Sequence, residues 1–153
     1  MASQLRHREF RFPVDVVWHG GRRTTARVAG KSPLRIATPP EFRGTDPDLW
    51  SPEDAFVAAA GSCLAVTIAA LAERERLPLH KLAVRAEGVV GRRADGRFGF
   101  VRIEQTVELH TDAEHEDTAR GLVATAEDGC LVSVSLALPV ETTVEIRALV
   151  PAG

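Results

Sequence analysis

The sequence predicts an α+β domain in which antiparallel sheets are wrapped around one long, central apolar helix. The first observation is the order of segments with strand-like and helix-like patterns, which is βββ, α, ββ, α, β. The second is a stretch of 18 uncharged residues at 55–72, long enough for a core helix. The third is composition, since 44% hydrophobic and 26% charged residues are typical of a folded globular chain. We therefore expect the 153 residues to form a single domain, with residues 1–8 as a loose N-terminal segment.

The first elements are three short strands, predicted at residues 10–18, 24–29 and 34–37. The pair Gly20-Gly21 and the run Gly-Lys-Ser-Pro at 30–33 supply the turns between them, so an antiparallel meander fits best. Residues 38–50 contain three prolines and a glycine, and this composition predicts a loop.

The long helix is predicted to begin at Pro52 and to run to Leu77. Ser51 is a suitable N-cap, and proline is favoured at the first helical position. Glu53 and Asp54 then complement the positive end of the helix dipole. Eight of the 18 uncharged residues are alanine, so the segment is only weakly hydrophobic, and we interpret it as a buried helix of a soluble protein rather than a membrane span.

The second half of the chain is predicted to contain a hairpin, a second helix and a last strand. The hairpin consists of strands at 82–90 and 98–110 around a turn at 94–97, and the last strand covers 142–150. The helix opens after Asp112 and is interrupted by Gly129. Its apolar side consists of Ala119, Leu122, Val123 and Ala126.

Charge and motif content exclude several classes of partner. With 19 basic and 21 acidic residues the net charge is −2, so we expect neither a nucleic acid nor a membrane as partner. The first residues lack the apolar stretch of a secretory signal, and two cysteines are too few for a disulfide framework, so we expect a cytoplasmic protein. Without a phosphate-binding glycine loop or metal-ligand spacing, we expect no cofactor and no metal.

The two cysteines are the candidate functional residues. Cys63 lies in the middle of the long helix among small residues, and Cys130 follows 67 residues later, at the end of the second helix. Both are consistent with buried structural thiols, because free cysteine is among the most buried residue types. Cys63 is too far from the helix N-terminus for activation by the dipole, so a reactive thiolate there needs a nearby cation. Arg22 and Arg23 are candidates for that cation.

Two segments carry a resemblance to a known family. They are Ser-Pro-Glu-Asp-Ala-Phe-Val-Ala-Ala-Ala-Gly-Ser-Cys-Leu at 51–64 and Ala-Glu-Asp-Gly-Cys-Leu-Val-Ser at 126–133. The combination of Pro-Glu, a cysteine ten residues after that glutamate, and a second cysteine in Cys-x-x-Ser resembles the superfamily of OsmC and organic hydroperoxide resistance (Ohr) proteins. The resemblance extends from residue 20 to the last strand. Leu131 departs from it, because family members usually have proline after the second cysteine.

The resemblance implies a peroxiredoxin-like, thiol-dependent peroxidase that reduces organic hydroperoxides, with inorganic ones as a further option. Cys63 would be the peroxidatic nucleophile, oxidised to a sulfenic acid, and Cys130 the resolving cysteine in a Cys63–Cys130 disulfide. Glu53 and an arginine would stabilise the thiolate for reaction. We take this arginine as Arg22, with Arg23 as the alternative. The resemblance also implies reduction by a small dithiol or a lipoyl-type protein. It does not separate the OsmC branch from the Ohr branch.

A different reading of the same residues stays open. In it the chain is a non-catalytic OsmC-like module that binds a small molecule, and both cysteines are structural. Slow, pH-insensitive alkylation of the two thiols would favour this reading.

Spacing restricts how Glu53 can act on Cys63. In a straight helix ten residues separate the two by about 15 Å along the axis and ~80° around it. Either the helix bends sharply at Gly61-Ser62, or Arg22 spans the gap, or Glu53 reaches Cys63 of a second subunit. We favour the last, because the helix is apolar around more of its circumference than one small sheet can cover. The resemblance likewise implies an intertwined homodimer with its sites at the interface.

Overall fold

The computed structural model describes residues 9–149, arranged in two compact units. One unit ends at Pro52 and the other begins at Glu53. The predicted loose segment 1–8 and the last residue of the predicted strand 142–150 lie outside the described residues. Both units combine strands with helical segments, and the second contains the long helix, so the predicted α+β class is confirmed. The single-domain organisation stays a prediction.

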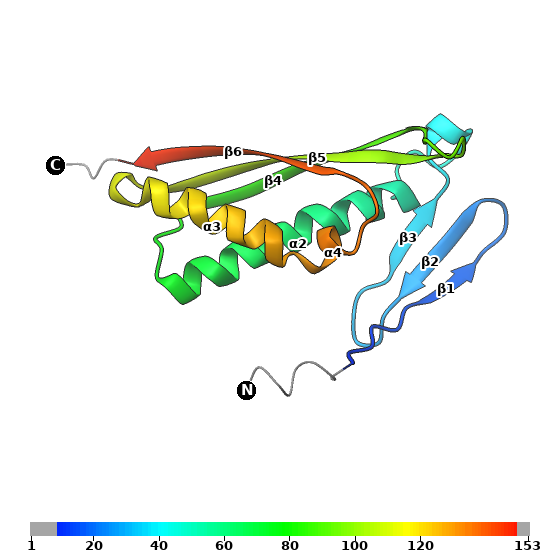
Figure 1. Cartoon of the computed structure of the whole chain (residues 1–153). Coiled ribbons are helices and arrows are strands. Elements are labelled where there is room, and N and C mark those ends of the chain that lie inside the picture. Colours follow the sequence, from blue (N-terminus) through cyan, green and yellow to red (C-terminus); the bar gives the residue numbers. More distant parts are fainter. Residues whose placement is uncertain (1–8, 150–153) are drawn as a thin grey trace. The chain divides into compact units, whose positions relative to one another are not determined.

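The first unit contains a three-stranded meander (Figure 1). Its strands are β1 (Asp15–Trp18), β2 (Arg23–Arg27) and β3 (Leu34–Ala37), and both neighbouring pairs are antiparallel, as predicted. β1 begins later than predicted. Pro13 precedes it and has no N–H group to donate to a strand ladder. The loop that follows β3 contains one 3-10 turn, η1 (Pro40–Phe42).

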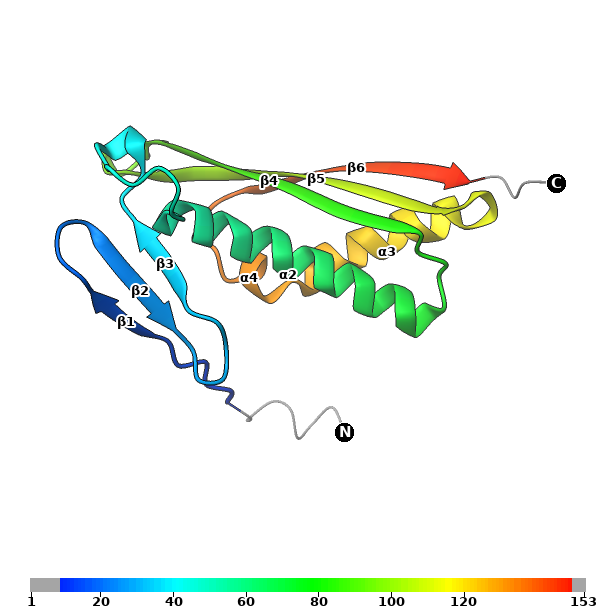
Figure 2. The same ribbon diagram turned by 180° about the vertical axis from the view of Figure 1, so that it is seen from behind.

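The second unit places its helices on one face of a three-stranded sheet (Figures 1 and 2). The helices are α2 (Pro52–Glu75), α3 (Glu116–Gly129) and the short α4 (Leu131–Val134), with a 3-10 turn η2 (Ala113–His115) before α3. The strands are β4 (Lys81–Arg92), β5 (Phe98–Asp112) and β6 (Val140–Leu149), in the spatial order β4-β5-β6. All predicted elements of this half are therefore present, with boundaries shifted by a few residues.

The direction of β6 corrects the prediction of purely antiparallel sheets. β4 and β5 form the predicted antiparallel hairpin, but β5 and β6 pair in parallel, from Ile103 opposite Val140 to Asp112 opposite Leu149. The chain leaves the end of β5, returns through α3 and α4, and starts β6 beside the middle of β5. A strand–helix–strand crossover of this kind places the two strands in parallel.

The core of the second unit lies between α2, α3 and the sheet. Helix α2 buries one face at helical spacing, through Ala60, Gly61, Leu64, Ile68 and Ala72. The predicted apolar side of α3 is buried completely. Strand β5 contributes an alternating inward row, namely Ile103, Gln105, Val107, Leu109 and Thr111. This core fixes the face of α2 that carries Cys63 against the sheet.

The remaining circumference of α2 is not covered within the second unit. Val66, for example, is 65% exposed. By length and composition α2 could cross a membrane, and only 28% of its most apolar window is buried. The helix therefore has one face in the core of its unit and an apolar remainder, so the expected buried helix is buried on one side only.

Candidate functional site

The structure brings the two cysteines into direct contact. Cys63 lies in the middle of α2 and is half-buried, whereas Cys130 is completely buried. The Cys63 thiol lies close enough to the Cys130 sulfur to lower its pKa, and both residues pack into the same apolar cluster. Both are free thiols. Two sulfur atoms 67 residues apart in the sequence are thus positioned as a potential redox pair.

A break between two helices positions Cys130. Helix α3 ends at Gly129, as predicted, and Cys130 adopts an extended conformation (φ −71°, ψ 104°) before α4 begins at Leu131. Cys130 is consequently the N-cap of α4. Ser133, through its side chain and its backbone, and the backbone of Val132 lie close enough to the Cys130 sulfur to lower the pKa of its thiol.

These neighbouring groups shift the pKa of Cys130. Burial is the largest single influence and on its own raises the pKa of the thiol. The neighbouring groups act in the opposite direction: the side chain and backbone of Ser133, then the Cys63 thiol and the backbone of Val132. Together they outweigh burial, and the pKa of Cys130 is lowered. The buried cysteine is therefore the one whose thiolate the surroundings stabilise.

The two candidate arginines lie at the start of β2, in the first unit. Gly20 and Gly21 both have positive φ (92° and 56°) and form the turn that presents them. The Nε of Arg23 donates to both carboxylate oxygens of Asp46 at 2.9 Å and lowers the pKa of that partly exposed carboxyl. Arg22 donates through Nη1 to two backbone carbonyls, Phe42 O at 2.9 Å and Arg43 O at 3.2 Å. Because carbonyls do not neutralise a guanidinium, Arg22 is the better candidate for an electrostatic role.

Glu53 lies in the first turn of α2, in the second unit. Its Oε2 atom is buried and has no hydrogen-bond partner among residues 9–149. Helix α2 continues without a break from Pro52 to Glu75, through Gly61 and Ser62 (Figure 2). Of the three arrangements considered for Glu53 and Cys63, a sharp bend at Gly61-Ser62 is therefore wrong. The other two stay predictions, since Arg22 belongs to the first unit.

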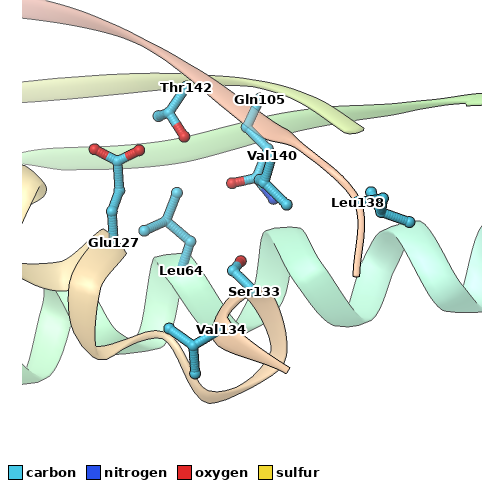
Figure 3. Close-up of a pocket in the computed structure, with 8 residues that line it drawn as sticks. All are labelled: Leu64, Gln105, Glu127, Ser133, Val134, Leu138, Val140 and Thr142. Atoms are coloured by element: carbon cyan, nitrogen blue, oxygen red, sulfur yellow. The ribbon is translucent and has the colours of Figure 1, made fainter. Parts of the chain in front are cut away.

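A cavity of about 220 Å³ lies in the second unit (Figure 3), and Ser133, which is close to the Cys130 sulfur, belongs to its wall. Its wall combines apolar and polar side chains: Leu64, Gln105, Glu127, Ser133, Val134, Leu138, Val140 and Thr142. Ser133 belongs both to this wall and to the surroundings of the Cys130 sulfur. Sequence reasoning missed Gln105, Glu127 and Ser133 as site residues. The signal for Gln105 was available, because strand alternation from Ile103 places it on the inner face.

Comparison with known proteins supports the same assignment of fold. A protein from Bacillus subtilis strain 168, "Uncharacterized protein YmaD", is 29% identical over 139 residues, which is 88% of this chain and 91% of that protein. An OsmC-like protein of unknown function from Vibrio cholerae superimposes with a TM-score of 0.82 at 17% identity, covering 90% of this chain and 100% of the other. An organic hydroperoxide resistance protein from Elizabethkingia anophelis gives a TM-score of 0.72 at 17% identity, over 93% and 100% of the two chains. At these identities the solved structures establish similarity of fold.

Family membership follows from the sequence itself. The family described as OsmC-like proteins matches residues 45–145, which include α2 with Cys63, the β4–β5 hairpin, and the Cys130 segment. The matched region covers well over half of the chain and contains both cysteines. The chain therefore belongs to the OsmC-like protein family.

Proposed function

We propose that this protein is a thiol-dependent peroxidase that reduces organic hydroperoxides through Cys63 and Cys130. The observation that carries the proposal is the closeness of the two thiols, one half-buried and the other completely buried. A peroxidatic cysteine has to meet its substrate, whereas a resolving cysteine only has to meet the oxidised sulfur. This difference in exposure supports the assignment of the first role to Cys63 and the second to Cys130.

In the first step the Cys63 thiolate attacks the terminal oxygen of the hydroperoxide. The O–O bond breaks, Cys63 becomes a sulfenic acid, and the leaving alkoxide takes up a proton to give an alcohol. Arg22 and Glu53 have the roles that the family resemblance implies. The guanidinium stabilises the anionic sulfur and the leaving oxygen, and the carboxylate holds the guanidinium in place.

In the second step Cys130 attacks the sulfenic acid sulfur of Cys63. A disulfide forms and the hydroxyl group leaves with a proton as water, so no further oxidant is consumed. The lowered pKa of Cys130 assists this step, because the thiolate is the attacking species. A dithiol reductant, either a small molecule or a lipoyl-type protein, then reduces the disulfide by two thiol–disulfide exchanges.

We also propose that two copies of the chain form the active protein. The apolar remainder of α2, including the 65% exposed Val66, requires a covering surface. Glu53 Oε2 is buried without a partner among the described residues, which suits a site that a second subunit completes.

The experiment that tests the proposal is hydroperoxide-dependent oxidation of a dithiol by single variants. Cys63→Ser abolishes turnover. Cys130→Ser performs one turnover and stops at a sulfenic acid on Cys63, which a dimedone probe labels. Full turnover by Cys63→Ser would show that the nucleophile is wrongly assigned. Slow alkylation of both wild-type thiols that does not vary with pH would favour a binding module with structural cysteines instead.

A further inference from the structure

The cavity lined by Ser133 is not used by the steps described above. It lies within the second unit, between α2, β5, α4 and the chain that leads into β6 (Figure 3). Ser133 connects it to the reactive pair, because this residue lines the cavity and also lies close to the Cys130 sulfur. A molecule in the cavity is therefore separated from Cys130 by one side chain.

Gln105 is the unusual residue of this cavity. It is 2% exposed, yet neither its amide nitrogen nor its amide oxygen has a hydrogen-bond partner among the described residues. Figure 3 shows its amide directed from β5 into the space between the sheet and α4. A buried amide without partners is destabilising, and native proteins retain such groups where a ligand or an ordered water pairs with them. Gln105 thus presents one donor and one acceptor to whatever occupies the cavity.

The other lining residues restrict the charge of the occupant. Glu127 contributes a carboxylate, while Ser133 and Thr142 contribute hydroxyl groups. None of the eight described lining residues is basic. An anionic group in the cavity would meet the Glu127 carboxylate without a neighbouring cation from this wall, so an uncharged polar group is favoured.

Apolar side chains and volume restrict the rest of the occupant. The apolar part of the wall consists of Leu64, Val134, Leu138 and Val140. A cavity of about 150 Å³ holds benzene. By proportion, the 220 Å³ found here suits a molecule of about nine non-hydrogen atoms.

We propose that this cavity binds the organic part of the substrate, an uncharged molecule with a small apolar body and one hydroxyl or amide group that pairs with the Gln105 amide. The inference rests on the proposed function and specifies its substrate class. Small neutral hydroperoxides are favoured, and those whose carboxylate would enter this cavity are disfavoured. Gln105 is then a specificity-determining residue that does not take part in the redox steps.

Binding is tested first, without peroxide, on the full-length reduced protein. Benzamide is the probe, because it has the expected size, no charge, and both a donor and an acceptor. Benzoate has the same shape with a negative charge. In titrations followed by ¹H–¹⁵N NMR, benzamide shifts the side-chain NH₂ signals of Gln105, and benzoate binds about tenfold more weakly or not at all. Equal binding of the two compounds, or no binding of benzamide, would overturn the proposal. This test uses only the wild-type protein.

Variants assign the binding to Gln105. Gln105→Leu keeps the side chain buried but removes both polar atoms, and it weakens benzamide binding by about tenfold. Thr106→Val is the matched control, since it is the next residue of β5 and lies outside the cavity wall. Benzamide affinity that is unchanged in Gln105→Leu, or equally reduced in Thr106→Val, contradicts the assignment.

Competition between benzamide and a hydroperoxide tests whether the substrate occupies the cavity during turnover. Benzamide raises the KM for a small neutral hydroperoxide that carries a hydroxyl group in the wild-type protein with kcat unchanged, and this effect is lost in Gln105→Leu. Binding through Gln105 without competition would overturn the substrate assignment. Failure of the wild-type protein to reduce any hydroperoxide would instead overturn the proposed function, and the benzamide titration distinguishes the two failures.

Discussion

At the scale of single residues, Cys130 illustrates how a buried thiol favours its ionised form. Its sulfur is completely buried, and this alone raises the pKa. Polar groups of Ser133, Cys63 and Val132 reverse that effect. The polar groups around a buried thiol can therefore favour its ionised form.

The Ser133 hydroxyl is expected to control the ionisation of Cys130. In a Cys63→Ser background, where one thiol remains, the ultraviolet absorbance of the thiolate appears at lower pH than for an ordinary cysteine. Ser133→Ala removes the group that lowers this pKa most and moves this transition to higher pH. Ser135→Ala is the control, because the Ser135 hydroxyl bonds the Leu131 carbonyl instead. Identical transitions in all three proteins would contradict the assigned cause of the lowered pKa.

The same shift predicts how stability varies with pH. A cysteine whose pKa is lower in the folded than in the unfolded protein stabilises the fold at pH values above its ordinary pKa of 9.0, and this contribution is lost as the pH falls through the folded-state pKa. Ser133→Ala should therefore reduce the free energy of unfolding more at high pH than at acidic pH, as measured by urea denaturation. A larger effect at acidic pH would show that the sign is wrong.

The two arginines of the first unit provide a second comparison at this scale. Arg23 is paired with Asp46, whereas the Nη1 contacts of Arg22 are with carbonyl groups that leave its charge in place. In a Cys130→Ser background, Arg22→Ala should slow alkylation of Cys63 by iodoacetamide at neutral pH by about tenfold, because the proposed function makes Arg22 the counter-charge of the reactive thiolate. Arg23→Ala serves as the control and leaves the rate near that of its parent. The opposite ranking would transfer the role to Arg23.

At the scale of elements, the packing of α2 against the sheet depends on a glycine in strand β4. A Cβ atom added at Gly88 in β4 would lie 2.5 Å from Val57 Cγ2 and 2.5 Å from Phe100 Cε1. Val57 belongs to the first half of α2, and Phe100 packs its ring 4.6 Å from that of Phe56 in the same helix. Gly88 thus permits the close approach that fixes the helix carrying Cys63.

We expect Gly88→Ala to destabilise the protein by about 1–3 kcal/mol, as overpacking of a filled core does. Gly91→Ala in the same strand is the control, since the added Cβ would meet its nearest neighbour at an ordinary 3.8 Å. This control should be neutral or stabilising by about 0.5 kcal/mol, because alanine loses less backbone entropy on folding. Urea denaturation measures both. Equal stability of the two variants would mean that α2 is not held by this contact.

The elements also indicate what the sequence can and cannot predict. Local signals, such as Pro52 and Gly129 at helix boundaries and the turn at 94–97, predicted the order of elements correctly. The parallel direction of β6 was missed, because the local sequence of a short terminal strand does not indicate which strand it pairs with or in which direction. The contact of Cys63 with Cys130 was implied only by the family resemblance. For Gln105, strand alternation predicts that the side chain faces inward, but it does not predict whether the amide has hydrogen-bond partners.

At the scale of the whole molecule, the uncovered part of α2 predicts self-association. Size-exclusion chromatography with light scattering should give twice the mass of one chain at micromolar concentration. Val66→Glu places a charge on the exposed apolar part of α2 and should shift the protein toward the single chain. Ala83→Glu, on an exposed position of β4, is the control and should leave the mass unchanged. A wild-type protein of one-chain mass would contradict the proposed dimer.

The central claim is that Cys63 and Cys130 form one redox pair. Its most direct test is mass spectrometry of the reduced protein after one equivalent of an organic hydroperoxide. The proposal predicts that each chain loses two hydrogen atoms, and that a protease digest contains the Cys63 peptide joined to the Cys130 peptide of the same chain. Two free thiols after treatment, or Cys63 oxidised to sulfinic acid while Cys130 stays reduced, would contradict it.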